Sequence, residues 1–323
     1  MPNEIFPGLF QIEVPLPESP LQSLNSYVIR GRDRHLIIDT GFNRQECLDA
    51  MLDGLRQIDI DLNQCDFFIT HLHADHFGLV SRLATKSSQI FFSRPDAELM
   101  ETWEGFEPMI AYGGQNGYPE NELRAALSQH PGNRYGTDWI SALKTLSDGD
   151  VIPAGDYQFR CIETPGHTLG HICLYEPDHK LLISGDHILG DITPNIQCWS
   201  DHQNPLKSYL ESLVKTAALD VTHVLPGHRR LFNGFQKRIQ ELTDHHHTRL
   251  KEVSSILAGG PMTAYAVASR MRWNIRCNSW SDFPVAPKWF ATGEALSHLR
   301  YLEFQQQIGR LSQNGQTLYR NLT

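Results

Sequence analysis

The sequence has no apolar run that approaches the ~20 residues needed to cross a bilayer. Its first five residues, Met-Pro-Asn-Glu-Ile, lack the basic stretch and apolar segment that mark a signal peptide. The six cysteines are scattered without CxxC spacing, which favours free thiols in a reducing compartment over a disulfide framework. We therefore expect a cytoplasmic protein without a membrane segment.

The sequence also has fewer positive than negative charges, and it lacks two common functional motifs. The formal net charge is -9 with histidine neutral, and an acidic surface disfavours non-specific binding to nucleic acid. The sequence contains no GxSxG motif, the usual sign of a serine nucleophile on a strand-to-helix turn. The C-terminal region has no glycine-rich phosphate loop, which a flavodoxin-like redox partner would need. These absences disfavour a nucleic-acid-binding module, a serine hydrolase and a flavodiiron-type redox protein.

The length and the hydrophobic pattern indicate an α/β protein with an appended helical region. The chain has 323 residues, of which 40% are hydrophobic and 20% charged, as in ordinary globular proteins. Residues 1–230 alternate short apolar runs with segments of helical spacing, and residues 95–148 form a helical insertion among them. Residues 231–323 predict helices over 235–257, 263–271 and 292–311 and then a hairpin turn, the order of a winged-helix-like domain. We expect one domain over 1–230 and a second over 231–323.

One short segment carries an unusual density of metal-ligand side chains. Three imidazoles and one carboxylate, His71, His73, Asp75 and His76, fall within six residues. They follow the apolar run 67–70 and precede a helical segment over 77–85, so we expect them at the end of a buried strand. Ionisable side chains at a strand end cost desolvation energy unless they are paired or bind a metal. Because imidazole and carboxylate are ligands of zinc, iron and manganese, the segment predicts a metal site.

Three later residues follow a common pattern. His167, Asp186 and His228 each follow a glycine directly and come after a short apolar run. Glycine lets the backbone turn sharply and approach a cofactor closely. Each of these segments is weak evidence alone, but together with residues 71–76 they indicate a complete ligand set.

The HxHxDH spacing of residues 71–76 and the order of the three later residues resemble the metallo-β-lactamase superfamily. The resemblance covers roughly residues 8–230 and implies an αββα sandwich with its site at one edge of two packed sheets. Residues 1–230 would then be the catalytic domain. The helical tail is similar in order and size to the branch that contains β-lactamase-like protein 2 and fungal polyketide thioesterases.

The resemblance further implies a dinuclear metal centre, with zinc expected and iron or manganese as alternatives. Two divalent ions lower the pKa of a bridging water, which gives a hydroxide that can attack a carbonyl at neutral pH. Asp75 would also carry a proton to the leaving group. Asp39, in an Asp-Thr-Gly turn, either supports the ligands from behind or is a simple turn residue, and support is favoured. The ligands would be His71, His73 and His167 for one ion, Asp75, His76 and His228 for the other, and Asp186 bridging both.

The remaining histidines are open to two interpretations each. His171 either supports the metal site or packs within a strand, and packing is the more common role. His187 follows Asp186 directly and either contacts substrate or packs in the fold. Residues 245–247 are three consecutive histidines in a predicted helix, where they cannot share one face, so we expect a solvated stretch.

Residues 95–148 form either a lid over the site or a surface excursion. Their aromatic side chains could line an apolar pocket for an acyl chain, or they could pack the insertion itself. Packing is slightly favoured for any single one. The aromatic residues are Trp103, Tyr112, Tyr118, Tyr135 and Trp139.

The leading prediction is a metal-dependent hydrolase that attacks an ester-like carbonyl, such as a thioester or lactone, in a small-molecule substrate. The alternative is a metal-dependent nuclease or phosphodiesterase, which needs cations near the site. Candidates are Arg229, Arg230, Lys237 and Arg238. A non-catalytic DNA-binding regulator is disfavoured by the intact ligand set, and an exported β-lactamase by the missing export signal. The Trp-rich tail is a candidate homodimer surface.

Overall fold

The first sheet begins with antiparallel strands and continues with parallel ones. The computed structural model describes residues 1–137, 143–275 and 277–322. Within these ranges, seven strands follow one another in the order β1-β2-β3-β4-β5-β6-β7. The pairs from β1 to β4 are antiparallel, and those from β4 to β7 are parallel. The strands are β1 (Asn3–Phe6), β2 (Leu9–Pro15), β3 (Ser23–Ile29), β4 (His35–Ile38), β5 (Cys65–Phe68), β6 (Ile90–Ser93) and β7 (Leu143–Leu146).

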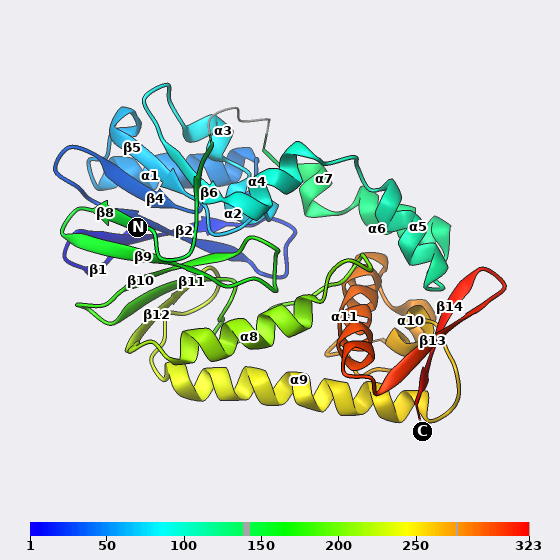
Figure 1. Cartoon of the computed structure of the whole chain (residues 1–323). Coiled ribbons are helices and arrows are strands. Elements are labelled where there is room, and N and C mark those ends of the chain that lie inside the picture. Colours follow the sequence, from blue (N-terminus) through cyan, green and yellow to red (C-terminus); the bar gives the residue numbers. More distant parts are fainter. Residues whose placement is uncertain (138–142, 276, 323) are drawn as a thin grey trace. The chain divides into compact units, whose positions relative to one another are not determined.

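The second sheet faces the first and is mostly antiparallel. In the described part of the chain it has five strands in the order β12-β11-β10-β9-β8, of which only β11 and β12 are parallel. Figure 1 shows this sheet in green beside the blue first sheet. Its strands are β8 (Val151–Ala154), β9 (Tyr157–Glu163), β10 (Ile172–Glu176), β11 (Leu181–Gly185) and β12 (His223–Pro226).

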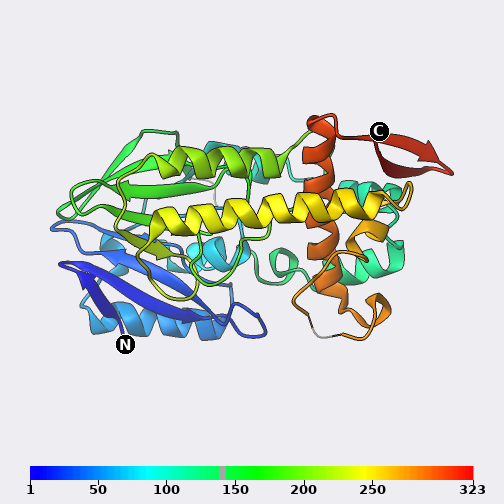
Figure 2. The same cartoon turned by 90° about the horizontal axis from the view of Figure 1, so that it is seen from below.

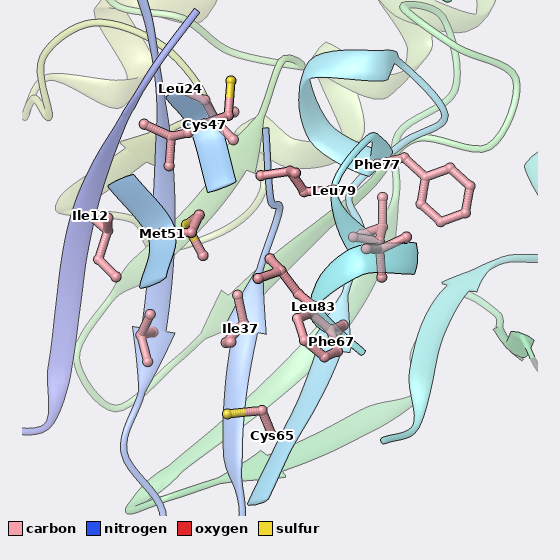
Figure 3. Packing of buried hydrophobic residues seen from close by; sticks show 14 of the residues in the cluster. Ile12, Leu24, Ile37, Cys47, Met51, Cys65, Phe67, Phe77, Leu79 and Leu83 are labelled. Atoms are coloured by element: carbon pink, nitrogen blue, oxygen red, sulfur yellow. The ribbon is translucent and has the colours of Figure 1, made fainter. Parts of the chain in front are cut away.

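Alternating side chains divide the first sheet between two cores. Ile38 points toward the second sheet and packs in the same cluster as Leu174 of β10. Its neighbour Ile37 points to the opposite face and lies in a cluster with Met51 and Leu79 (Figure 3). Successive residues of a strand face opposite sides, so a strand that is buried on both faces has a continuous apolar run. The expected sandwich of two sheets between helical layers is confirmed.

Helices cover the outer face of the first sheet. In α1 (Gln45–Gln57), Cys47, Met51 and Leu55 recur every four residues and are buried on one face. The single helix predicted over 77–85 is wrong, because the structure has two short ones. Leu79 donates its amide to the carbonyl of Gly41 at 3.0 Å, outside the helical hydrogen-bond pattern. The remaining elements near this sheet are α2 (Ala74–Phe77), α3 (Val80–Leu83), α4 (Arg94–Glu101) and the 3-10 turn η1 (Leu62–Gln64).

The chain divides into two compact units. Unit 1 comprises Met1–Thr102, Arg134–Pro194 and Ser212–Ile239, and unit 2 comprises Trp103–Asn133, Asn195–Glu211 and Gln240–Thr323. The boundaries of these units differ from those of the expected domains 1–230 and 231–323. Residues 103–133 and 195–211 group with the C-terminal part. One boundary falls within α8 (Pro205–Ala217) and another within α9 (Phe235–Leu257). Figure 2 shows α9 as one uninterrupted helix.

Unit 2 is mainly helical. Its core contains Leu123 and Trp289, and the ring of Trp289 stacks on that of Trp199 at 3.5 Å between centroids. The helix expected over 292–311 lies at 285–304 instead, and residue Gln306 adopts a left-handed φ of 56° before the hairpin begins. Pro284 lies directly before the first helical turn and marks the start of this helix, which we expected later, at residue 292. The elements are α5 (Glu107–Gln115), α6 (Glu120–Ser128), α10 (Ala264–Ala268), η2 (Trp280–Asp282), α11 (Val285–Phe304), β13 (Ile308–Gln313) and β14 (Gln316–Asn321), and α7 (Pro131–Tyr135) lies at its boundary.

The order of helices followed by a hairpin agrees with the expected order for the tail, and its winged-helix character stays a prediction. Among the described helices, none combines the length and apolar character required to cross a membrane.

Candidate metal centre

The ligand-rich segment runs from the loop after β5 into α2, at the edge where parallel strands end. β4 and β5 pair in register, and Asp39 directly after β4 accepts a hydrogen bond from the amide of Thr70 after β5. The carboxyl ends of parallel strands gather at one edge of a sheet, where their loops approach each other. His71 and His76 are fully buried there, and His73 is the residue that precedes the first turn of α2.

The three later residues reach this edge from the second sheet. His167 lies between β9 and β10, Asp186 follows β11 directly, and His228 comes shortly after β12. Gly227 leaves no room for a side chain, since a Cβ there would lie 2.6 Å from Asp186 Oδ1 and 2.8 Å from His76 Cε1. The glycine before His228 is therefore required by the close approach of these ligands.

The structure brings all seven expected ligands together in unit 1. Asp186 lies between the others: its Oδ1 is 3.5 Å from His76 Nε2, and its Oδ2 is 3.7 Å from His167 Nε2 and 3.4 Å from His228 Nε2. Within the described residues, three groups have all their donor atoms within 4.8 Å of one another. They are His71, His73 and His167; His71, His76 and Asp186; and Asp75, His76 and His228.

The chemistry of this cluster fits a divalent metal ion. Asp186 Oδ1 is buried and accepts no hydrogen bond from the described residues. Burial lowers the pKa of His73 to about 3, with His167 adding to the effect, so this imidazole is neutral at pH 7. Neutral imidazole and ionised carboxylate are the forms that bind metals. The cluster could therefore hold metal ions.

The group around His228 is charged when it holds no metal. Burial lowers the pKa of His228, but the carboxylates of Asp186 and Asp75 outweigh burial and raise it to about 10. For Asp75, burial raises the pKa, but His228 and His76 outweigh it and lower the value to about 2. The pKa of His76 is raised well above its usual value, because Asp39 and Asp186 outweigh its burial. Metal uptake at this group would therefore release protons.

Asp39 supports the ligands through a network of short bonds. Its Oδ2 lies 2.7 Å from His76 Nδ1, and its Oδ1 accepts from the amide of Thr70 at 2.8 Å. The Thr70 hydroxyl donates to Asp39 at 2.8 Å and lies 3.0 Å from His71 Nδ1. Asp39 adopts a left-handed φ of 59°, a strained conformation that functional sites often contain. These are the contacts of a residue that orients the ligands, as we expected in preference to a plain turn residue.

Sequence reasoning undervalued His171 and missed Asp96. His171 is fully buried, its Nδ1 lies 2.8 Å from Thr164 Oγ1, and its Nε2 accepts from the amide of Asp186 at 3.1 Å. It therefore orients Asp186 in addition to packing. The only sequence signal for Asp96 is the spacing from Ser93, typical of a helix N-cap, and Ser93 Oγ does accept from the Asp96 amide. This spacing indicates where α4 begins, but it does not predict the hydrogen bonds that the Asp96 carboxylate accepts from other loops.

The structure favours one of the two interpretations of His187 and corrects the expectation for residues 245–247. His187 is fully buried, and its Nε2 lies 3.3 Å from Thr216 Oγ1 of α8, so it packs in the fold rather than facing a substrate. The solvated stretch expected over 245–247 is wrong for His246, which is fully buried with its Nδ1 3.2 Å from His298 Nε2. Successive residues of a helix point about 100° apart, so one of three consecutive histidines can face inward while another, His247, is exposed.

The aromatic residues of 95–148 mostly pack within their own units. Tyr118 is 2% exposed in the core of unit 2, and the Tyr112 hydroxyl is hydrogen-bonded in that unit. Tyr135 packs against another ring in unit 1. Trp103 is exposed, and Trp139 lies outside the described residues.

Comparison with known proteins agrees with this geometry. The family model of the metallo-beta-lactamase superfamily matches residues 21–228. The chain is 25% identical over 316 residues to the probable metallo-hydrolase YqjP of Bacillus subtilis, and the match covers 92% of each chain. It is 28% identical over 241 residues to the acyl-coenzyme A thioesterase MBLAC2 of Homo sapiens, with 71% of this chain and 79% of the relative covered.

A solved structure extends the likeness over almost the whole chain. A metallo-beta-lactamase family protein from Thermus thermophilus is 25% identical with a TM-score of 0.83, and the match covers 98% of this chain and 100% of that one. The tail after residue 230 therefore has a counterpart in a protein of the same family. This chain belongs to the metallo-beta-lactamase superfamily and is a hydrolase of that family.

Proposed function

We propose that the chain hydrolyses a small acyl thioester with two divalent metal ions bound at the cluster in unit 1. The observation that carries the proposal is the grouping of seven imidazole and carboxylate side chains, Asp186 among them, at one edge of unit 1. Two relatives named acyl-coenzyme A thioesterase, from Homo sapiens and Bos taurus, support the thioester as the substrate class. Lactones and other ester-like carbonyl compounds present a similar electrophile and form the wider class.

The residues divide between two ions. When bound, the ions would supply a nucleophile from water at neutral pH and polarise the scissile carbonyl. Asp39 and His171 keep His76 and Asp186 oriented, as their hydrogen bonds indicate. The ligands would be His71, His73 and His167 for one ion, Asp75, His76 and His228 for the other, and Asp186 for both.

Asp75 is suited to move a proton as well as to bind metal. Its side chain keeps 11% of its surface exposed, and its Oδ2 lies 3.3 Å from His228 Nε2. Its pKa is lowered to about 2, because His228 and His76 outweigh the opposing effect of burial, so the carboxylate is ionised at neutral pH. We propose that Asp75 takes up the proton that the attacking water gives up and passes it to the leaving thiolate, which departs as the thiol.

Several further proposals rest on chemistry rather than geometry. Zinc is the first candidate metal because histidine and carboxylate ligands suit it, with iron and manganese next. A cytoplasmic location is supported by the cysteines, of which five are buried and free. We also propose a small-molecule substrate, with a homodimer as the candidate assembly.

The nuclease alternative receives no support from the basic residues that follow His228. Arg229 donates to Gln22 Oε1 and to the carbonyl of Pro20. Arg230 donates to Asp191, and Arg238 donates to backbone carbonyls at 189 and 192. These guanidinium groups are already engaged within the protein, so a phosphate would have to compete for them.

The substrate proposal is tested by comparing an acyl-coenzyme A with bis(p-nitrophenyl) phosphate on metal-loaded protein. We expect turnover of the thioester, followed through the released thiol, and little or none of the phosphodiester. The variant His73→Ala should lose thioester turnover because it removes one donor of the first group. The matched control is His247→Ala, the same substitution at an exposed histidine of α9. Turnover of the phosphodiester alone would contradict the proposal.

A further inference from the structure

Asp96 is a fully buried carboxylate that the proposed chemistry does not use. It lies in the first turn of α4, with a relative exposure of 0%. Its two oxygens accept three hydrogen bonds from outside that helix. The donors are the amide of Leu72 at 3.0 Å, the hydroxyl of Thr168 at 3.2 Å and the amide of Gly170 at 2.8 Å.

These donors belong to the two loops that supply the first ligand group. Leu72 lies between His71 and His73, and Thr168 is the residue after His167. The bonds from Asp96 span 24 and 72 residues to these two loops, so one side chain ties distant segments to each other. Leu72 and Thr168 are each the sequence neighbour of a ligand. The hydrogen bonds to Asp96 therefore fix the distance between the loop of His71 and His73 and the loop of His167.

The backbone at Gly170 shows how close this approach is. A Cβ at Gly170 would lie 2.0 Å from Ser93 Oγ and 2.7 Å from Asp96 Cγ. No side chain fits there without displacing α4 or the loop. The loop after His167 therefore packs directly against the Asp96 carboxylate.

Within the described residues, Asp96 forms no ion pair, and its three partners are neutral donors. Burying a carboxylate that has no cation beside it costs free energy, unless positive charge elsewhere in the site stabilises it. Two bound divalent ions, held by ligands next to its hydrogen-bond partners in the chain, would supply that positive charge.

We propose that Asp96 is a positioning residue that clamps the loops of His71–His73 and His167 together, and so sets the affinity of the first metal ion. The proposal rests on the proposed metal centre but not on the thioester as substrate. Outer hydrogen-bond partners of metal ligands typically change metal affinity by about 10–100-fold when they are replaced. Asp96→Asn keeps the size of the side chain but puts an NH2 group against at least one of the donors.

The test is a titration of metal-free protein with Zn²⁺ against a chromophoric chelator, which resolves two binding steps. For Asp96→Asn we expect one step weakened by about 10–100-fold and the other unchanged. Thr168→Val, which removes one donor, should weaken the same step less, and Thr168→Ser, which keeps the hydroxyl, should restore it. The matched control is Asp66→Asn, an acidic residue of β5 that pairs with Arg34 and a backbone amide. It should lower the melting temperature without altering either step.

The weakened step is assigned with a double-mutant cycle. In the background of His73→Ala, where the first group is already broken, Asp96→Asn should add no further loss of Zn²⁺ affinity. A wild-type protein that takes up no Zn²⁺ would overturn the metal centre itself, and with it this inference. If the wild type binds two ions and Asp96→Asn and Thr168→Val bind them equally well, the clamp alone is overturned. Equal weakening of both steps, or further loss in the His73→Ala background, would also overturn it.

Discussion

Asp186→Ala is expected to lower thioester turnover by at least ~10³-fold and to reduce metal binding at both positions. The reason is geometric, because Asp186 Oδ2 lies near both His167 and His228, while its Oδ1 lies near His76. One carboxylate thus reaches members of both ligand groups. Its removal also takes away one of the two carboxylates that raise the pKa of His76 and of His228 against burial, and leaves Asp39 beside the former and Asp75 beside the latter. The measurement is kcat together with zinc content by mass spectrometry.

The control for Asp186→Ala is the same substitution at Asp191, five residues later in unit 1. The Asp191 side chain is 38% exposed and pairs with Arg230 at the surface. Exposed pairs contribute about 0–1 kcal/mol, so Asp191→Ala should keep both its metal content and its turnover. An Asp186→Ala protein that retained two ions and wild-type kcat would show that this carboxylate does not link the two groups.

Asp75→Asn is expected to reduce kcat by about 10²–10⁴-fold even when excess metal restores full occupancy. The carboxylate has two roles in the proposal, since it is a donor of the second group and the carrier of the proton. The amide keeps the shape of the side chain but neither binds a divalent ion well nor accepts a proton. At low metal the variant should hold about one ion per chain, because the group of His71, His73 and His167 is untouched.

Activity as a function of metal concentration separates the two roles of Asp75. If excess zinc restores occupancy but not kcat, the residual loss belongs to proton transfer. The matched control is Asp53→Asn, an exposed residue of α1 that pairs with Arg56 three residues later. Full activity of Asp75→Asn with two bound ions would contradict both roles at once.

The ligand set could be read from the sequence because its spacing is local. Residues 71–76 follow a buried strand directly, and each of the later ligands follows a glycine at the end of another strand. The edge at which these strands end is a property of the fold, which the resemblance to the metallo-β-lactamase superfamily implies. For this reason the sandwich and all seven expected ligands are found together in unit 1.

The roles of the residues that support the ligands could not be predicted from the sequence, for a different reason. Asp96 acts through backbone amides and a hydroxyl that lie 24 to 74 residues away, and amides leave no trace in a sequence. His171 orients Asp186 through that residue's own amide, which again has no sequence signature. Hydrogen bonds to the main chain depend on how loops fold against each other, so they appear only in three dimensions.

Unit 2 shows the same limit on a larger scale. Lys288 of α11 is 4% exposed and pairs with Glu122 of α6 at 2.8 Å across 166 residues of sequence. The Tyr319 hydroxyl donates to Asn116 across 203 residues. Local periodicity predicts that these helices exist, as α6 and α9 illustrate. It does not predict that residues 103–133 group with the C-terminal part in one compact unit.

The most direct test of the dinuclear centre is anomalous diffraction at the zinc edge from crystals of the zinc-loaded wild type. We predict two peaks per chain, one among His71, His73 and His167 and the other among Asp75, His76 and His228, with Asp186 between them. Metal content measured on the same preparation should be two ions per chain. A single peak, or peaks away from these side chains, would contradict the account.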